Sequence, residues 1–170
     1  MNCELEKNMG EKKPITVEAA KIRMADLCAR SEQCEADIRQ KLYRLGLTSG
    51  DVQRVITELT EEKFIDNARF ARSFARDKCR FSCWGRYKIR LALTAKRLTP
   101  HEIAQGLDAI EKADYLDALK RTTLAKAKTL DLNGPDAREE RMKLFRHLIS
   151  RGFESDIASK AVKAVIAKMG

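Results

Sequence analysis

One segment of the chain carries residues whose chemistry suits binding to a polyanion. Arg69 is followed three and seven residues later by arginines, so their guanidinium groups are expected along one face of a helix. Phe81, Trp84 and Tyr87 then alternate with further basic residues, and an exposed ring can stack on a nucleic-acid base while cations meet the phosphates. The predicted binding residues are Arg69, Arg72, Arg76, Lys78, Arg80, Trp84, Arg86, Tyr87, Lys88, Arg90, Lys96 and Arg97.

The net charge of the chain is concentrated in this segment. The stretch from Arg69 to Arg97 contains ten basic residues and a single acid, Asp77. Its net charge is therefore +9, which equals the net charge of the whole chain. Solvated helices usually mix the two signs, so the segment favours a polyanionic partner, with an ordinary solvated face as the alternative. Trp84 has an alternative of its own, which is to fill the core between helices.

Other reactive residue types are too scattered to predict catalysis or a metal site. Cys79 and Cys83 are one helical turn apart, but the only histidines, His101 and His147, are distant from them in sequence. The chain also lacks a glycine-rich phosphate loop and a His-Glu-x-x-His motif. We therefore expect no enzymatic activity, no cofactor and no metal, and we expect the five cysteines to be free thiols.

The elements that position these residues are predicted to be helices throughout. Only eight glycines and three prolines interrupt 170 residues, and the β-branched residues form no alternating runs. The clearest helix start is at Thr99, which can cap a helix that has Pro100 in its first turn and Glu102 to complete a capping box. Nine helices are expected, in three sets of three.

A repeated spacing divides these helices into similar units. Ile38-Leu42-Gly46, Ile89-Leu93-Arg97 and Leu144-Leu148-Gly152 share their intervals, so a unit of about 50 residues recurs three times. A unit of that size buries only a thin core and is expected to stack on its neighbours. We predict an all-α fold of three tandem three-helix modules, built only from right-handed helices and stacked into an elongated, curved body. The predicted segments are a mobile N-terminal arm at 1–14 and modules at 15–64, 65–113 and 114–170.

No segment of the sequence is apolar enough for a membrane span or a secretion signal. The longest aliphatic stretch, Ala164-Val165-Ile166-Ala167, is far shorter than the roughly 20 residues that cross a bilayer. We therefore predict a cytoplasmic protein that does not contact membranes. Packing between helices accounts for the apolar faces, which favours a monomer.

Four motifs occur in a fixed order along the chain. They are Cys34-x-x-Asp37-Ile38-x-x-Lys41-Leu42, Ile65-Asp66-Asn67-Ala68-Arg69-Phe70-Ala71, Gly85-x-x-Lys88-Ile89 and Leu148-x-x-Arg151-Gly152-Phe153. In this order and spacing they resemble the signatures of the RecX family of recombination regulators. The resemblance runs from about Ile22 to Val165, nearly the whole chain.

Two positions depart from the family pattern. Cys34 stands where the family has a serine that caps the second helix, and a thiol accepts poorly, so this cap is expected to be weaker by roughly 1 kcal/mol. Arg97 stands where the family usually has glycine, and a left-handed arginine would cost roughly 1 kcal/mol. We expect either a turn that is built differently or an arginine held by a ligand.

The resemblance implies a non-enzymatic protein without cofactor that acts in recombination, DNA repair and the SOS response. Members lie along the groove of a RecA-type recombinase filament on single-stranded DNA and suppress its ATPase and strand exchange. Our addition is that the basic middle module faces acidic side chains and DNA phosphates in that groove. Two alternatives stay open: direct binding of single-stranded nucleic acid by the Arg69, Arg72 and Arg76 row with Trp84, and a helical scaffold for another acidic protein.

Overall fold

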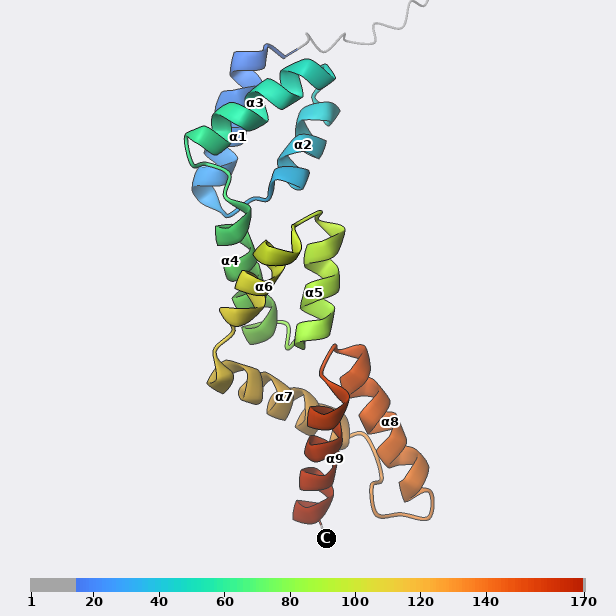
Figure 1. Ribbon diagram of the computed structural model, residues 1–170. Coiled ribbons are helices and arrows are strands. Elements are labelled where there is room, and N and C mark those ends of the chain that lie inside the picture. The colour runs from blue at the N-terminus through green and yellow to red at the C-terminus, as the bar shows by residue number, and fades with distance from the viewer. Residues whose placement is uncertain (1–14, 170) are drawn as a thin grey trace, which may run out of the picture.

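The computed structural model describes residues 15–169, which form an elongated stack of nine helices without a strand (Figure 1). We call the three sets of helices module 1 (α1–α3), module 2 (α4–α6) and module 3 (α7–α9). Helix α7 runs across the long axis, so module 3 bends away from the line of the first two modules (Figure 1). The predicted all-α fold of stacked three-helix modules is confirmed, while the predicted arm at 1–14 lies outside the described residues.

Local sequence signals explain where most helices begin. Thr16, Thr48 and Asp66 each accept a hydrogen bond from the backbone amide three residues further along the chain. Thr99 and Glu102 form the predicted capping box at the start of α6. The helices are α1 Val17–Arg30, α2 Glu35–Arg44, α3 Ser49–Glu61, α4 Asn67–Arg80, α5 Arg86–Ala95, α6 Pro100–Asp108, α7 Lys112–Ala127, α8 Ala137–Ser150 and α9 Ser155–Met169.

The same left-handed turn follows the second helix of every module. The φ angles are 87° at Gly46, 62° at Arg97 and 89° at Gly152. Glycine adopts this conformation freely, whereas a side chain there costs roughly 1 kcal/mol. Arg97 therefore forms the turn that the other modules build with glycine, and the expectation of a differently built turn is wrong.

Two apolar cores hold the helices together. Module 1 has a core of its own around Ile38, Leu42 and Leu59, all fully buried. The second core is continuous through modules 2 and 3 and contains the repeat residues Leu93 and Leu148. Burying one such side chain stabilises the fold by about 1.5 to 3 kcal/mol. Modules 2 and 3 thus share one core, to which module 1 contributes only its edge: Cys34 is buried in it and Ala36 packs against it.

Helix α4, which carries much of the basic segment, lies against α6 at very short range. A Cβ added to Gly106 of α6 would be 2.9 Å from the carbonyl oxygen of Ala71 in α4. The two backbones can approach because Gly106 has no side chain and Ala71 has only a methyl group. This contact fixes α4 in the middle of the molecule.

Candidate binding face of the middle module

Lysine ammonium groups and aromatic rings alternate on module 2. Lys78 Nζ lies 5.5 Å from the ring centroid of Phe74 and 5.1 Å from that of Trp84. Lys88 Nζ lies 4.7 Å from the Trp84 ring. Each such contact is worth about 0.5 to 1 kcal/mol where it is exposed to water. Such contacts favour positions of the ammonium groups beside the rings.

The alternation continues toward module 1. The rings of Phe70 and Phe74 are 5.6 Å apart, and Lys96 Nζ lies 5.5 Å from the Phe70 centroid. Phe70 is buried, while the three lysines and the other two rings are half-buried. These contacts link three cations and three rings in one series. We call the six residues the cation–aromatic ladder: Phe70, Phe74, Lys78, Trp84, Lys88 and Lys96.

Trp84 takes part in the packing between helices, which is one of the two roles that the sequence left open. Its half-buried ring packs against the second core. Two lysine ammonium groups already lie over the ring. More accessible rings are those of Phe81, which is 80% exposed, and Tyr87, which is 61% exposed. Phe81 was missing from the predicted binding residues, although its position between Arg80 and Trp84 at a helix end was the available signal.

The predicted row of three arginines does not stay together as one surface. Arg69 Nε forms an ion pair with Glu32 Oε1 in module 1 at 2.6 Å. Arg72 Nη1 donates to Gln105 Oε1 of α6 at 3.0 Å. Arg76 is exposed and its Nε donates to the backbone oxygen of Arg72 at 3.2 Å. Of the three side chains, only Arg76 is exposed, and the other two are half-buried.

Two basic residues of module 2, Arg69 and Lys96, form ion pairs with acids of module 1. Besides the Arg69–Glu32 pair, Lys96 Nζ lies 2.6 Å from Asp37 Oδ2. All four side chains are partly exposed to water. Exposed pairs contribute about 0.2 to 1 kcal/mol each. Part of the positive excess of module 2 is thus neutralised by its neighbour.

Two more basic residues pair with acids of module 3. Arg80 Nε lies 2.6 Å from Asp114 Oδ2, and Arg86 Nη1 lies 3.7 Å from Glu154 Oε1. The Arg86 guanidinium also lies 4.1 Å from the ring centroid of Tyr115. These residues join modules 2 and 3 as well as carrying charge.

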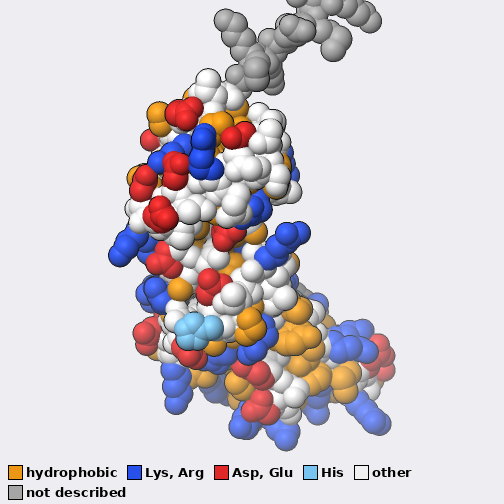
Figure 2. All heavy atoms as spheres, turned by 45° about the horizontal axis from the view of Figure 1, so that its top comes forward, with side chains coloured by type: hydrophobic (Ala, Val, Ile, Leu, Met, Phe, Trp, Pro, Cys, Tyr) orange, Lys and Arg blue, Asp and Glu red, His pale blue; other side chains and the backbone are white. Residues whose placement is uncertain are grey.

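Six predicted binding residues keep their charge available. Within residues 15–169 none of the six forms an ion pair, in contrast to the four that bridge to neighbouring modules. Figure 2 shows acidic and basic side chains intermixed on the face that it presents, with a hydrophobic area toward the end away from module 1. The six are Arg72, Arg76, Lys78, Lys88, Arg90 and Arg97.

The two buried cysteines, Cys34 and Cys79, are poorly placed to act as nucleophiles. Burial is the main cause that raises the pKa of the thiols of Cys34 and Cys79 above the ordinary value, so the nucleophilic thiolate is disfavoured. In the part of the chain that the structure describes, no three His, Cys, Asp or Glu residues come together as metal ligands would. None of the described helices combines the length and the apolar character that a bilayer span requires.

Comparison with known proteins identifies two of the modules. The family model of the RecX second three-helix domain matches residues 66–107, and that of the third three-helix domain matches residues 114–162. A protein of Prosthecochloris aestuarii named "Regulatory protein RecX" is 34% identical over 124 residues, which cover 73% of this chain and 78% of the relative. The chain belongs to the RecX family. The two matched domains correspond to modules 2 and 3.

Further relatives agree with this assignment. A regulatory protein RecX of Clostridium botulinum is 29% identical over 137 residues, which cover 81% of this chain. The chain spans only 64% of the length of that relative. The crystal structure of RecX from Lactobacillus salivarius is similar with a TM-score of 0.75 at 16% identity, covering 89% of this chain and 97% of that one. At this identity the likeness establishes the fold.

Proposed function

We propose that this protein binds a RecA-type recombinase filament on single-stranded DNA and inhibits the recombinase, including its ATPase and strand exchange. It would thereby modulate recombination and DNA repair. The observation that carries the proposal is the set of six unpaired cations on module 2, at the centre of an elongated RecX-family body. Its relatives are named regulatory proteins, which supports a regulator over an enzyme.

The geometry explains why a filament groove suits this surface. A groove between recombinase subunits on DNA offers phosphates and acidic side chains along its length. Lys78 and Lys88, the ladder cations without an ion pair in residues 15–169, lie half-buried beside rings, so less side-chain entropy is lost when they meet such groups. Exposed cations such as Arg76 and Arg90 should speed association and make it sensitive to salt.

We further propose that the protein acts in the cytoplasm as a monomer, without a cofactor. A monomer is supported by the two cores of residues 15–169, in which the buried apolar side chains pack against one another rather than against a second copy. Recombinase filaments on single-stranded DNA form where the chromosome is accessible, which is the compartment that this role requires.

The test is the DNA-dependent ATPase of the cognate recombinase, titrated with the protein and with the variant Arg76→Glu/Arg90→Glu. Both side chains are exposed and without an ion pair in residues 15–169, so their replacement should spare the fold. We expect wild-type protein to inhibit and the variant to require roughly tenfold more protein, equivalent to about 1.4 kcal/mol.

A matched control changes the net charge equally in module 3. The variant Arg138→Glu/Arg146→Glu alters two exposed arginines of α8. It should inhibit as the wild type does. Equal loss in both variants would show that only overall charge matters, and absence of inhibition by the wild type would refute the proposal.

Direct binding of single-stranded nucleic acid is the second candidate, and the exposed rings of Phe81 and Tyr87 favour it. Stacking of a base on such a ring is worth about 1 to 3 kcal/mol. This function requires tight binding of bare oligothymidylate, a steep salt dependence, and a strong loss in Phe81→Ala/Tyr87→Ala. Filament binding instead predicts weak affinity for the bare oligonucleotide.

A further inference from the structure

Module 1 carries a second concentration of positive charge that the sequence patterns did not reveal. A groove of about 560 Å³ lies between the C-terminal halves of α1 and α2. Arg23 and Arg30 of α1 and Lys41 and Arg44 of α2 line it, with Asp26 as the one acid among its lining residues. We call it the basic groove. It involves none of the residues of the cation–aromatic ladder.

The cations of the basic groove differ from other cations of module 1 in the part of the chain that the structure describes, where acids are plentiful. None of the four forms an ion pair within residues 15–169. By contrast, Lys21 lies 2.8 Å from Glu58 and 2.6 Å from Glu62, and Arg39 lies 2.7 Å from Glu35. Attraction to helix C-termini accounts for cations in the last turn of a helix, but not for Arg23 in the middle of α1. The basic groove therefore has unsatisfied positive charge.

The remaining lining residues of the basic groove are aliphatic. Met24 is buried, while Leu27 and Leu45 are half-buried and keep part of their surface exposed. No aromatic ring belongs to the lining. Single-stranded nucleic acid binds through cations together with rings on which bases stack. The basic groove provides the cations but none of the rings. Apolar side chains flanked by carboxylates would use both the cations and the aliphatic floor.

We propose that the basic groove docks an acidic polypeptide segment of a partner protein. Leucine-like side chains of that segment pack on Leu27 and Leu45, and its Asp and Glu side chains bind the cations. Arg23 and Arg44 are exposed and suited to bidentate pairing with carboxylates. This site goes beyond filament binding by module 2, because it lies on another module and requires no DNA.

The test uses the full chain and a short fluorescein-labelled peptide in which leucines are interspersed among glutamates. Fluorescence anisotropy compares it with an all-glutamate peptide of equal length and with oligothymidylate of similar charge. We expect the leucine-containing peptide to bind most tightly. The variant Arg23→Glu/Lys41→Glu should weaken that binding roughly tenfold. The control variant Arg138→Glu/Arg146→Glu should leave it unchanged.

A second variant separates the aliphatic floor from the charge. Leu27→Ser keeps every cation and should abolish the preference for the leucine-containing peptide over the all-glutamate peptide. Circular dichroism melting checks that both variants remain folded. Three results would overturn the proposal: no peptide binding, equal losses in the groove and control variants, or a loss of oligothymidylate binding in the groove variant that exceeds its loss of peptide binding. The last result would make the basic groove a nucleic-acid site.

Discussion

Modules 2 and 3 are joined through their backbones, whereas the contacts described between modules 1 and 2 are made by side chains. At the junction of modules 2 and 3, the amide of Gly85 donates to the carbonyl of Arg151 at 2.8 Å. The amide of Tyr87 donates to the carbonyl of Gly152 at 3.0 Å. The N-terminus of α5 thus meets the chain just beyond the C-terminus of α8, where its free amides find acceptors.

Two glycines make this approach possible. A Cβ added to Gly85 would overlap the carbonyl group of Gly152, and a Cβ added to Gly152 would overlap the Cβ of Lys88. Arg151 also donates from its guanidinium to the backbone oxygen of Ser82. The junction is therefore closed by backbone contacts that tolerate no added atom.

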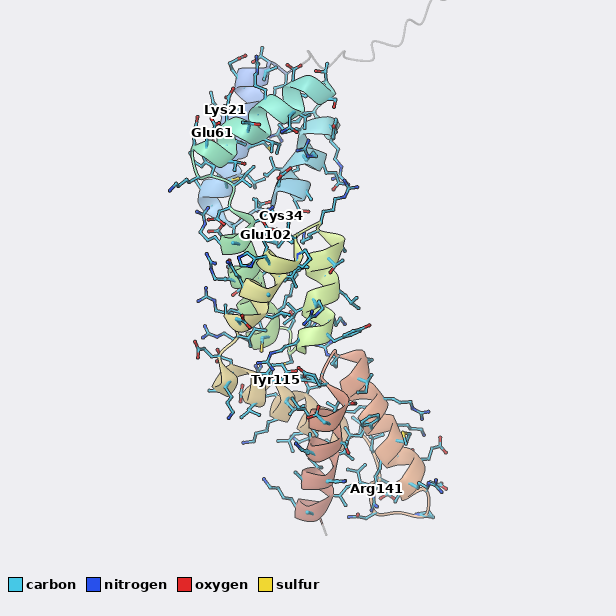
Figure 3. All side chains as sticks on the ribbon, in the orientation of Figure 1. Lys21, Cys34, Glu61, Glu102, Tyr115 and Arg141 are labelled. Carbon is cyan, nitrogen blue, oxygen red and sulfur yellow. The ribbon has the colours of Figure 1, made fainter. Side chains whose placement is uncertain are left out.

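The Tyr115 side chain strengthens the same junction from the side of module 3 (Figure 3). Its hydroxyl donates to Glu154, and its ring lies 5.5 Å from that of Phe153. Burial, followed by the bond to Glu154, raises the pKa of Tyr115 above its ordinary value. The hydroxyl therefore remains a donor throughout the physiological range.

The junction of modules 1 and 2 has the same plan with different residues. In the repeat, Cys34 occupies the place of Gly85 and Arg97 that of Gly152. Figure 3 shows Cys34 at the end of module 1 that faces module 2, and its side chain is fully buried in the core of modules 2 and 3. A pocket of about 480 Å³ at this junction is lined by residues of both modules, Asp37 and Arg97 among them. Side chains at both positions thus replace direct backbone contact.

The cap of α2 shows how this junction is held. Cys34 makes no side-chain capping bond, as expected for a thiol. The amide of Glu35 instead donates to Asn67 Oδ1 of α4 at 2.9 Å. Module 2 therefore supplies the cap that the sequence of module 1 lacks. The comparison indicates that module 1 should separate from module 2 at a lower free energy than module 3 does.

The largest expected effect comes from placing a methyl group in the closed junction. Gly152→Ala should lower the free energy of unfolding by about 3 kcal/mol, because the new Cβ overlaps Lys88 and the φ of 89° disfavours a side chain. Urea denaturation measures it. Gly50→Ala in α3 is the control, since its Cβ meets nothing within 4 Å and should stabilise by about 0.5 to 1 kcal/mol. A loss under about 1 kcal/mol in Gly152→Ala would contradict the closed junction.

Removing the Asn67 side chain, which caps α2, should weaken the junction of modules 1 and 2. Asn67→Ala should cost about 1 kcal/mol, as other lost N-caps do. Limited proteolysis should then cleave more rapidly around residues 31–34. Thr16→Ala removes the cap of α1, which is remote from the junction, at similar cost. If the two variants are cleaved there at the same rate, Asn67 does not hold the modules together.

The ion pair between Lys96 and Asp37 should add less. A double-mutant cycle with Lys96→Met and Asp37→Asn is expected to give a coupling energy of about 0.5 kcal/mol that declines in high salt, since both side chains are partly exposed. The corresponding cycle for Arg80 and Asp114 serves as the comparison across the closed junction. A coupling energy that does not respond to salt would contradict a solvent-screened pair.

The smallest effect concerns His147, which lies on α8 close to Arg151 at the closed junction. Burial, with Lys126 and Arg151 nearby, lowers its pKa below 6.5, so the folded state favours the neutral ring. Stability is then complete above pH 6.5 and declines as the pH falls, because the unfolded chain gains a proton first. Urea denaturation at about pH 7.5 and 5.5 should show this decline, reduced in His147→Gln. A rise in stability on acidification that disappears in His147→Gln would instead show that folding raises the pKa of His147.

Local patterns predicted much of the fold, and long-range pairing decided the rest. Thr99 with Glu102, and the repeat that places Gly46 and Gly152 after equivalent helices, depend on residues close in sequence. The split of the arginine row could not be foreseen, because the direction of Arg69 depends on Glu32, 37 residues earlier. The approach of Gly85 to Gly152 likewise depends on how the modules stack. The presence of a glycine in each of these two motifs was a usable signal of a close backbone contact.

Hydrogen–deuterium exchange of the protein, alone and with the recombinase filament on oligothymidylate, tests the proposed function most directly. We predict that the filament slows exchange most in residues 81–87 of module 2, which run from the end of α4 into the start of α5 and lie between the cations Lys78 and Lys88 in the sequence. Oligothymidylate without recombinase should produce little protection there. Protection absent from module 2, or produced in full by the oligonucleotide, would contradict filament binding through this module.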